Sequence, residues 1–354
     1  MSPPTTNKER VMKKNVMLAV LGVCTLLLGT TVAFGQKKAG LSAAPELTIP
    51  IGARYVATSG ANIANVSGVD AITWNPAGLD AGTGSNALFS YRQYIADISV
   101  SYVALSTKIE GVGSLGLSLR SFNIGSIDVT TETQPDGNGQ VINPTFFTLG
   151  ISYSRQLSDR VAFGVNVNAV SEGFGGVSAS GIAFDAGVQY KNLIGVEGLA
   201  LGVTVRNIGT SMQYGGSSLW VQANDPSSAR GLTNYKIEAA TFQMPSVIDL
   251  GVGYTKPLDE DNSLRISGAY ENDNYGIDGY RVGGEYAFQN SIFIRAGYLY
   301  STDPSGTVSI FQNYTLGAGV NLQKYAGVGI SVDYAYVPVK YFSANHLIDI
   351  RMEF

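Results

Sequence analysis

Three groups of residues in this sequence have types and spacings that could support chemistry. Gly111, Gly113 and Gly116 have the spacing of a dinucleotide-binding loop, and such a loop needs a strand before it and a helix after it. Beyond the last glycine, however, Leu117 and Leu119 alternate with polar residues, as they would in a strand. We therefore interpret this glycine pattern as part of a β-strand and predict no bound cofactor.

The only histidine, His346, would have to serve any zinc site or hydrolytic triad in the chain. Zinc sites combine several Cys and His ligands, but the only cysteine, Cys24, lies close to the N-terminus in an apolar run. No serine near His346 has the spacing of a nucleophile elbow. The sequence therefore predicts no catalytic residues, no metal site and no enzyme.

Oxygen-bearing side chains gather at Asn272, Asp273, Asn274 and Asp278. Oxygen-rich loops can bind calcium, but these positions do not reproduce the EF-hand spacing. We interpret them as solvated turn residues, with calcium binding in an exterior loop as the alternative.

The composition indicates a membrane protein rather than a soluble enzyme. The chain contains 43 Gly, 20 Tyr and 14 Phe, and only 14% of its residues are charged, against about a quarter in soluble domains. Its formal net charge is -4, and removal of residues 1–35, with four basic residues and one acidic residue, changes it to -7. Nucleic acid is therefore not an expected partner, because its phosphates require a basic surface.

The N-terminus has the features of a secretory signal peptide. Lys13 and Lys14 precede an apolar run over 16–28, and the small-x-small pattern of 33–35 predicts cleavage before Gln36. We expect translation to start at Met12, so that the residues before it are an upstream extension. The apolar run is shorter than the roughly 20 residues that a membrane-spanning helix needs, which favours cleavage over anchoring.

The rest of the chain has the alternation of a transmembrane β-barrel. It has no further apolar run long enough for a spanning helix, so only a closed barrel can satisfy the backbone in lipid. Within 161–169, for example, apolar side chains alternate with small or polar ones. We expect an all-β fold, an antiparallel barrel of about fourteen strands, at 85–93, 97–108, 112–122, 145–156, 160–171, 180–191, 199–207, 245–256, 262–272, 279–288, 291–301, 312–322, 326–336 and 345–354.

Connection lengths predict the orientation of this barrel. The connections after every even-numbered strand up to the twelfth are short, whereas those after strands 3, 5, 7, 11 and 13 are longer, and 208–244 is the longest. In outer-membrane barrels the short turns are periplasmic and the long loops are exterior. We therefore expect both termini in the periplasm of a cell with an outer membrane.

The predicted inward faces carry many glycines, such as Gly164 and Gly187, and scattered charges such as Asp185, Glu285 and Arg295. Glycines allow another stretch of backbone to approach closely. We expect residues 36–84 to supply it as an N-terminal hatch or plug. The predicted domains are thus 1–35, the extension and signal peptide; 36–84, the hatch; and 85–354, the barrel.

Two parts of the sequence resemble PorV/PorQ-type outer-membrane proteins. The first combines 51–54, the small residues 57–64, and 70–79; the second is 333–336 followed by His346 and Phe354. The motif at the end of the first part consists of Trp74, Asn75, Pro76, Ala77, Gly78 and Leu79. At 58–60 the chain has Thr-Ser-Gly, where the family usually has a glycine pair. The family is related to the FadL fatty-acid transporters, which are fourteen-stranded barrels with an N-terminal hatch.

This resemblance implies two functions. The first is an accessory role in type IX secretion, handling secreted cargo with a conserved C-terminal domain and meeting attachment-complex proteins at the cell surface. The alternative is FadL-like uptake of hydrophobic small molecules, and a scaffold barrel without transport is a third possibility. The other expected partners are outer-membrane lipid and the barrel-assembly machinery.

Two further sets of residues are candidates for contacts. Aromatic residues of the longest loop could meet a protein partner or cover the barrel mouth, or could pack within the loop: Tyr214, Trp220, Tyr235 and Phe242. The apolar face of the last strand, Ile350, Met352 and Phe354, is expected to be the signal for barrel assembly.

Overall fold

The computed structural model of the chain describes residues 41–224, 231–302, 311–323 and 329–354. The chain divides into two units, Met1–Lys37 and Lys38–Phe354, and every described residue belongs to the second. The predicted signal peptide and its cleavage site therefore lie outside the described residues. Within the described ranges, no helix is long and apolar enough to cross a bilayer.

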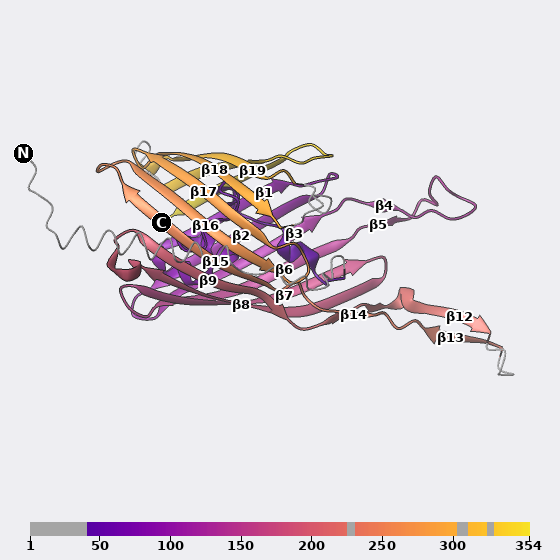
Figure 1. The fold of residues 1–354 in the computed structure, drawn as a ribbon. Coiled ribbons are helices and arrows are strands. Elements are labelled where there is room, and N and C mark those ends of the chain that lie inside the picture. The colour runs from indigo at the N-terminus through magenta and orange to yellow at the C-terminus, as the bar shows by residue number, and fades with distance from the viewer. Residues whose placement is uncertain (1–40, 225–230, 303–310, 324–328) are drawn as a thin grey trace, which may run out of the picture. The chain divides into compact units, whose positions relative to one another are not determined.

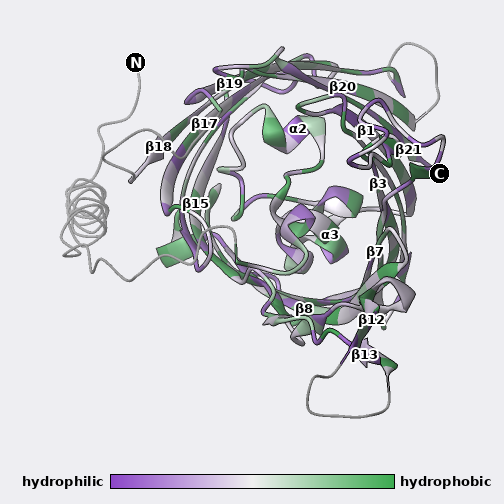
Figure 2. Cartoon of the chain, turned by 90° about the vertical axis from the view of Figure 1, so that its right-hand side faces the viewer, coloured by the Kyte–Doolittle hydropathy of each residue, from purple (hydrophilic) through white to green (hydrophobic). Residues whose placement is uncertain are grey.

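Fourteen antiparallel strands form a closed barrel (Figures 1 and 2). Each pairs with its neighbour along the chain, and the first pairs with the last. The strands are β1 (Ser85–Gln93), β2 (Ser99–Ile109), β3 (Gly113–Asn123), β6 (Thr145–Gln156), β7 (Val161–Phe174), β8 (Val177–Lys191), β9 (Leu199–Gly209), β15 (Val247–Pro257), β16 (Ser263–Asp273), β17 (Gly279–Phe288), β18 (Ile292–Ser301), β19 (Tyr314–Asn321), β20 (Gly329–Val337) and β21 (Asn345–Glu353). The predicted fold and strand number are confirmed, and every strand end lies within three residues of its predicted position.

The two faces of the strands differ as a membrane barrel requires. In β3, Leu115, Leu117 and Leu119 are exposed on the outside, whereas Ser114 and Ser118 are buried toward the inside. Alternate side chains of a strand point to opposite faces, so one face meets lipid and the other meets the contents of the barrel.

One predicted connection is wrong. The segment after the fifth strand was expected to be a longer loop, but β7 continues to Phe174 and β8 begins at Val177. Gly175 and Gly176 join them with φ values of 54° and 85°, as in the two-residue turns that preserve strand twist. The strands therefore extend further before turning, and this glycine pair was the signal in the sequence.

Shorter elements occupy the connections. They are β4 (Ile127–Asp128), β5 (Val141–Ile142), η4 (Leu193–Gly195), β10 (Met212–Gln213), β11 (Gly215–Gly216), η5 (Ser217–Leu219), β12 (Trp220–Asn224), β13 (Leu232–Lys236) and β14 (Thr241–Phe242). β11 pairs with the start of β8, and β10 pairs with β14. β12 and β13 pair only with each other among the described strands, and Figure 1 shows this hairpin beyond the barrel strands. We call 210–246 the long loop.

Residues 41–84 lie inside the barrel, and we call them the luminal segment. Figure 2 shows two of its helices within the ring of strands. The helices are η1 (Pro45–Thr48), α2 (Ala53–Val56), η2 (Gly68–Asp70), α3 (Ala71–Trp74) and η3 (Pro76–Ala81). Tyr55, Ile63 and Leu79 are fully buried and belong to one apolar cluster with Leu88 and Leu347 of the wall.

Glycines of the wall make room for this segment. A methyl group at Gly164 would lie 2.2 Å from the Pro76 carbonyl carbon, and one at Gly187 would lie 2.0 Å from Asn75 Oδ1. At Gly297 it would lie 2.3 Å from the Thr58 carbonyl carbon. Backbone of the luminal segment thus lies against these inward glycines, while the action of this segment as a hatch stays a prediction.

Candidate functional site

The predicted motif 74–79 forms a bend near the C-terminal end of the luminal segment. α3 ends at Trp74, Asn75 is extended, and Pro76 begins η3. Asn75 Oδ1 accepts a hydrogen bond of 3.2 Å from the backbone N–H of Ala77, which is N-capping of η3. Proline suits the first position of a helix because it has no N–H that would need a partner there. The motif is therefore a capped turn.

Asn75 also joins the turn to the wall. Its Nδ2 donates to the carbonyl oxygens of Ile63, at 3.0 Å, and Val188 of β8, at 3.2 Å. Its neighbour Trp74 donates through Nε1 to the carbonyl oxygen of Ile51, at 2.9 Å. One buried amide thus connects two stretches of the luminal segment and one wall strand.

The remaining motif residues are also in close contact with the wall or with other parts of the luminal segment. The Ser154 hydroxyl of β6 donates to the Ala77 carbonyl oxygen, at 2.9 Å. A methyl group at Gly78 would lie 2.1 Å from the Val66 carbonyl oxygen, and Leu79 is buried. The structure therefore explains each of these residue types by packing inside the barrel.

Asp80, directly after the motif, is an anchor that the sequence interpretation missed. Its carboxylate accepts from Ser114 Oγ and from the backbone N–H of Gln156, each at 2.8 Å. Lys108 Nζ lies 3.6 Å from the same carboxylate. Its position after a recognisable motif was the available signal, but its three partners lie on distant strands.

Buried ion pairs fix the middle of the luminal segment to the later strands. Arg54 Nε lies 3.4 Å from Glu285 Oε2, and Glu285 also accepts a 2.6 Å hydrogen bond from Arg295 Nε. Arg351 Nη2 of β21 lies 2.8 Å from Asp70 Oδ2. The sequence interpretation placed Glu285 and Arg295 on the inward face but could not identify their partners.

A second buried charge group surrounds a bulge between β8 and β9. Asp185 faces both Arg206 and Asn207, and Asn207 has a positive φ of 59°. Arg206 Nη2 lies 2.8 Å from Asp249 Oδ2, and Asp249 in turn faces Arg281. A bulge redirects side chains locally, and here both Arg206 and Asn207 line one internal cavity.

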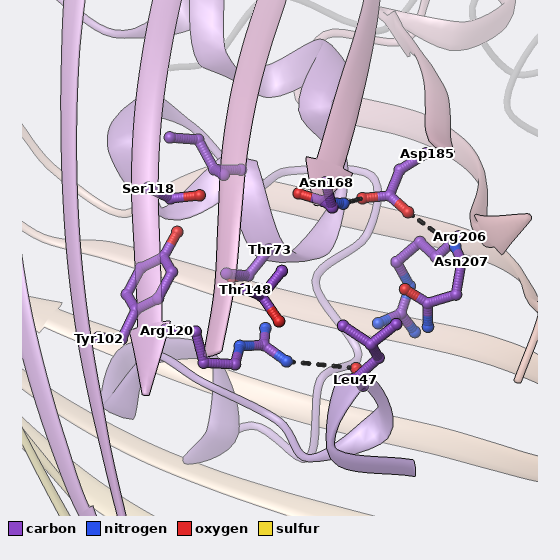
Figure 3. A pocket seen from close by; sticks show the side chains of 11 residues that line it. Leu47, Thr73, Tyr102, Ser118, Arg120, Thr148, Asn168, Asp185, Arg206 and Asn207 are labelled. Carbon is purple, nitrogen blue, oxygen red and sulfur yellow. Dashed lines mark hydrogen bonds between the residues drawn. The ribbon is translucent and has the colours of Figure 1, made fainter. Parts of the chain in front are cut away.

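That cavity, drawn in Figure 3, has a volume of about 40 Å³ and a largely polar lining. Arg120 donates to the Leu47 carbonyl oxygen at 3.4 Å, and Asn168 donates to Asp185 at 2.9 Å. Ligand pockets usually measure roughly 300–1,000 Å³ and are mostly apolar. This cavity therefore suits a few water molecules rather than a hydrophobic ligand.

Two larger hollows, of about 280 and 310 Å³, lie near the ends of the barrel. The first is lined by apolar residues such as Val66 and Leu199 as well as by Lys191, and the second by Tyr214 and Lys236 among others. Polar and charged side chains thus contribute to both linings.

The four predicted loop residues fall into two pairs. Tyr214 and Phe242 are half-buried against an apolar cluster at the base of the long loop. Trp220 and Tyr235 lie on the β12–β13 hairpin with 57% and 40% of their surface exposed. The structure thus separates two residues that pack within the protein from two that are accessible to a partner.

The last strand places the predicted assembly signal at the seam with the first strand. Met352 and Phe354 are exposed on the outward face, and Ile350 is half-buried. Phe354 exchanges two backbone hydrogen bonds of 3.0 Å with Ser85. His346 is exposed, and its Nδ1 lies 2.7 Å from the Tyr334 hydroxyl.

The oxygen-rich loop at 272–278 is bonded internally. Asp273 Oδ1 accepts from the backbone N–H groups of Tyr275 and Gly276, and Asp278 Oδ1 accepts from Asn272 and from the Asp273 backbone. Within the described part of the chain, no three His, Cys, Asp or Glu side chains are grouped so that they could hold a metal ion. These contacts are those of a turn.

The family model described as type IX secretion system protein PorV matches residues 33–218. No protein of curated function matches the sequence significantly. Neither the matched family nor the similar structures below are described as enzymes.

Among solved structures, the CymD monoaromatic hydrocarbon channel is similar with a TM-score of 0.57 and 14% identity, over 86% of this chain and 97% of that one. The toluene transporter TodX of Pseudomonas putida gives a TM-score of 0.52 at 14% identity, over 89% and 98%. A FadL homologue of Pseudomonas aeruginosa gives 0.50 at 12%, over 86% and 98%. At these identities the likeness establishes the barrel fold alone.

Proposed function

Because the chain belongs to the PorV family of type IX secretion system proteins, we propose that it is an outer-membrane accessory of that system, which handles secreted cargo proteins at the cell surface. The observation that carries the proposal is the family match itself. It covers the described luminal segment, the first seven barrel strands and the start of the long loop.

The contents of the barrel support a role in contacts rather than in conduction. The luminal segment is bonded to the wall on several sides, by Asp80 to β3 and β6, by Asn75 to β8, and by Asp70 to β21. Breaking a buried ion pair leaves an uncompensated charge, which costs roughly 3–5 kcal/mol. Because this ion pair and the hydrogen bonds hold the segment at several points, they favour a closed lumen.

The β12–β13 hairpin supplies a surface for partners. Trp220, Val221, Leu232 and Tyr235 are all at least 40% exposed, and an isolated two-stranded hairpin is only marginally stable in water. Trp and Tyr are also the residue types that most often dominate protein interfaces.

We propose that this end of the barrel lies at the cell surface and that both termini lie in the periplasm. The wall would then contact lipid, and the barrel-assembly machinery would be the partner during insertion.

Uptake of a hydrophobic small molecule is the second candidate. The similarity of the fold to the CymD and TodX channels favours it, since those proteins are described as carrying aromatic hydrocarbons. Uptake by this chain would require displacement of the luminal segment or a gap in the wall. The polar lining of the 40 Å³ cavity does not favour an apolar path.

A pull-down of the tagged protein from its own membranes in mild detergent, followed by mass spectrometry, separates the two functions. We expect recovery of secreted proteins that share a C-terminal domain, or of attachment-complex proteins. The variant Trp220→Ser/Tyr235→Ser should lose them. Leu157→Ser, which changes an apolar residue that is 65% exposed in a short turn, is the matched control and should retain them.

Recovery of the barrel alone, with a co-purified lipid or other apolar ligand, would favour uptake instead. Equal recovery of cargo with the hairpin variant and the wild type would agree with the secretion function but would show that the hairpin is not part of the contact surface.

A further inference from the structure

The start of the luminal segment meets the end of the long loop. Ser42 and Gln243 form an isolated parallel bridge, and the backbone N–H of Ala43 donates to the Gln243 carbonyl oxygen at 2.9 Å. The two stretches are about 200 positions apart in the sequence. This β-bridge therefore joins the start of the luminal segment to the end of the long loop.

A buried glutamate joins the same two parts. Glu172, near the end of β7, accepts a 2.9 Å hydrogen bond from the backbone N–H of Ala44 through Oε1. Its other oxygen, Oε2, accepts from the hydroxyl of Tyr214 in the long loop. The side chain is fully buried, so this one carboxylate has a partner in each part.

Apolar side chains surround these contacts. Leu47 of the luminal segment clusters with Val170 of β7 and with Met212 and Met244 of the long loop, all of them buried. Separating the loop from the segment would expose this apolar surface to water, which is unfavourable. The polar and apolar contacts therefore join the same two stretches of the chain.

We propose that this unit, made of the Ser42–Gln243 bridge, Glu172 with its two donors, and the cluster around Leu47, is a latch that makes the long loop and the start of the luminal segment open together. A protein that pulls the long loop away would then release residues 42–47. The latch is a property of the fold and does not depend on which cargo or ligand the barrel handles.

A second carboxylate makes the latch sensitive to pH. Glu46 is buried, and its carboxylate oxygens accept no hydrogen bond from a donor within the described structure. Burial, and next the nearby charge of Glu172, raises the pKa of Glu46 to about 8. The opposing charge is Arg120 of β3, which donates to the backbone oxygens of Glu46 and Leu47.

The direction of the pH effect follows from this raised pKa. In the closed latch Glu46 keeps its proton up to about pH 8, whereas in the open form it loses the proton near its ordinary value of 4.5. The closed form is therefore most stable at low pH and loses stability as the pH rises between these two values. Above about pH 8, Glu46 would carry a buried charge in the closed latch.

Hydrogen exchange, measured by mass spectrometry on the full, detergent-solubilised protein, tests both the coupled opening and its pH dependence. Protection factors, corrected for intrinsic rates, are compared at pH 6 and pH 9 for peptides covering 42–47 and 210–216. We expect both peptides to lose at least about tenfold in protection at pH 9. Glu46→Gln should abolish this response and keep both peptides protected at pH 9.

Tyr214→Phe should lower the protection of both peptides at either pH, because it removes the donor from the loop. The matched controls Tyr235→Phe and Glu238→Gln change exposed long-loop residues and should behave as the wild type. Opening of the loop peptide alone would overturn the coupling, and a wild-type pH response in Glu46→Gln would overturn the role of that carboxylate.

A disulfide cross-link provides a second test in case these variants do not fold. Ser42→Cys/Gln243→Cys, oxidised to a disulfide, should hold both peptides protected at pH 9, and reduction should restore the pH response. Loss of protection in both peptides despite the closed disulfide would contradict the latch.

Discussion

Arg351 in the last strand and Asp70 in the luminal segment form a buried ion pair of 2.8 Å, although 280 residues separate them in the sequence. The final strand thus completes the barrel wall and also binds what the barrel contains. Closure of the barrel and placement of the luminal segment are therefore coupled through one guanidinium group.

The stability losses caused by removing Asp70 and Arg351 should not be additive. Asp70→Asn and Arg351→Gln are each expected to lower the urea midpoint for loss of the compact, heat-modifiable form, because each leaves a buried charge with a partner missing. In the double variant the losses should be less than additive, by about 1–3 kcal/mol. Asp70→Asn combined with Lys256→Gln, an exposed residue of another strand, is the additive control; additivity in both combinations would refute the coupling.

The close approach at Gly164 predicts a steric effect. Gly164→Ala would place a methyl group 2.2 Å from Pro76, and the forced shift should cost about 1–3 kcal/mol in the same midpoint measurement. At Gly284 the added methyl group would have its nearest contact at 3.9 Å, so Gly284→Ala should be close to neutral. A neutral Gly164→Ala would show that the luminal segment is not packed against β7.

Asn75 combines two roles that substitution can separate. Asn75→Asp keeps an acceptor for the Ala77 N–H but loses the donors to Ile63 and Val188, whereas Asn75→Ala loses both. Hydrogen exchange over 60–80 should therefore increase in both variants, by about 0.5–2 kcal/mol for the cap lost in Asn75→Ala. The increase should be larger in Asn75→Asp, because its buried carboxylate would face two carbonyl oxygens with no donor between them. If Asn75→Asp matched the wild type, the contact with the wall would contribute nothing.

Phe354→Ser should impair barrel assembly. The residue is 75% exposed at the seam between β21 and β1, so its side chain contributes little to packing, and a loss of yield would point to recognition during insertion. The measurement is the fraction of heat-modifiable barrel recovered from membranes. Glu353→Ser, at the neighbouring exposed position, is the control, and a normal yield with Phe354→Ser would refute the assembly signal.

The sequence by itself determined the barrel. Alternation in segments such as 161–169 is a local property, because neighbouring side chains of a strand must face opposite environments, and it placed all fourteen strands. The connection after the fifth strand was predicted too long, since a long alternating strand that ends in a two-residue turn resembles a shorter strand followed by a loop. The motif 74–79 was recognisable, and its bend follows from the chemistry of Asn and Pro.

Only the tertiary structure decided which residues meet inside the barrel. Asp80 finds its partners on β3 and β6, Asn75 on β8, and Asp70 on β21; nothing in local spacing selects among the many inward charges and amides. The same holds for the long loop, where Tyr214 turns inward to Glu172 while Trp220 stays exposed. Strand periodicity fixes the face on which a side chain lies, whereas partners across the lumen depend on barrel closure and on the path of the segment that fills it.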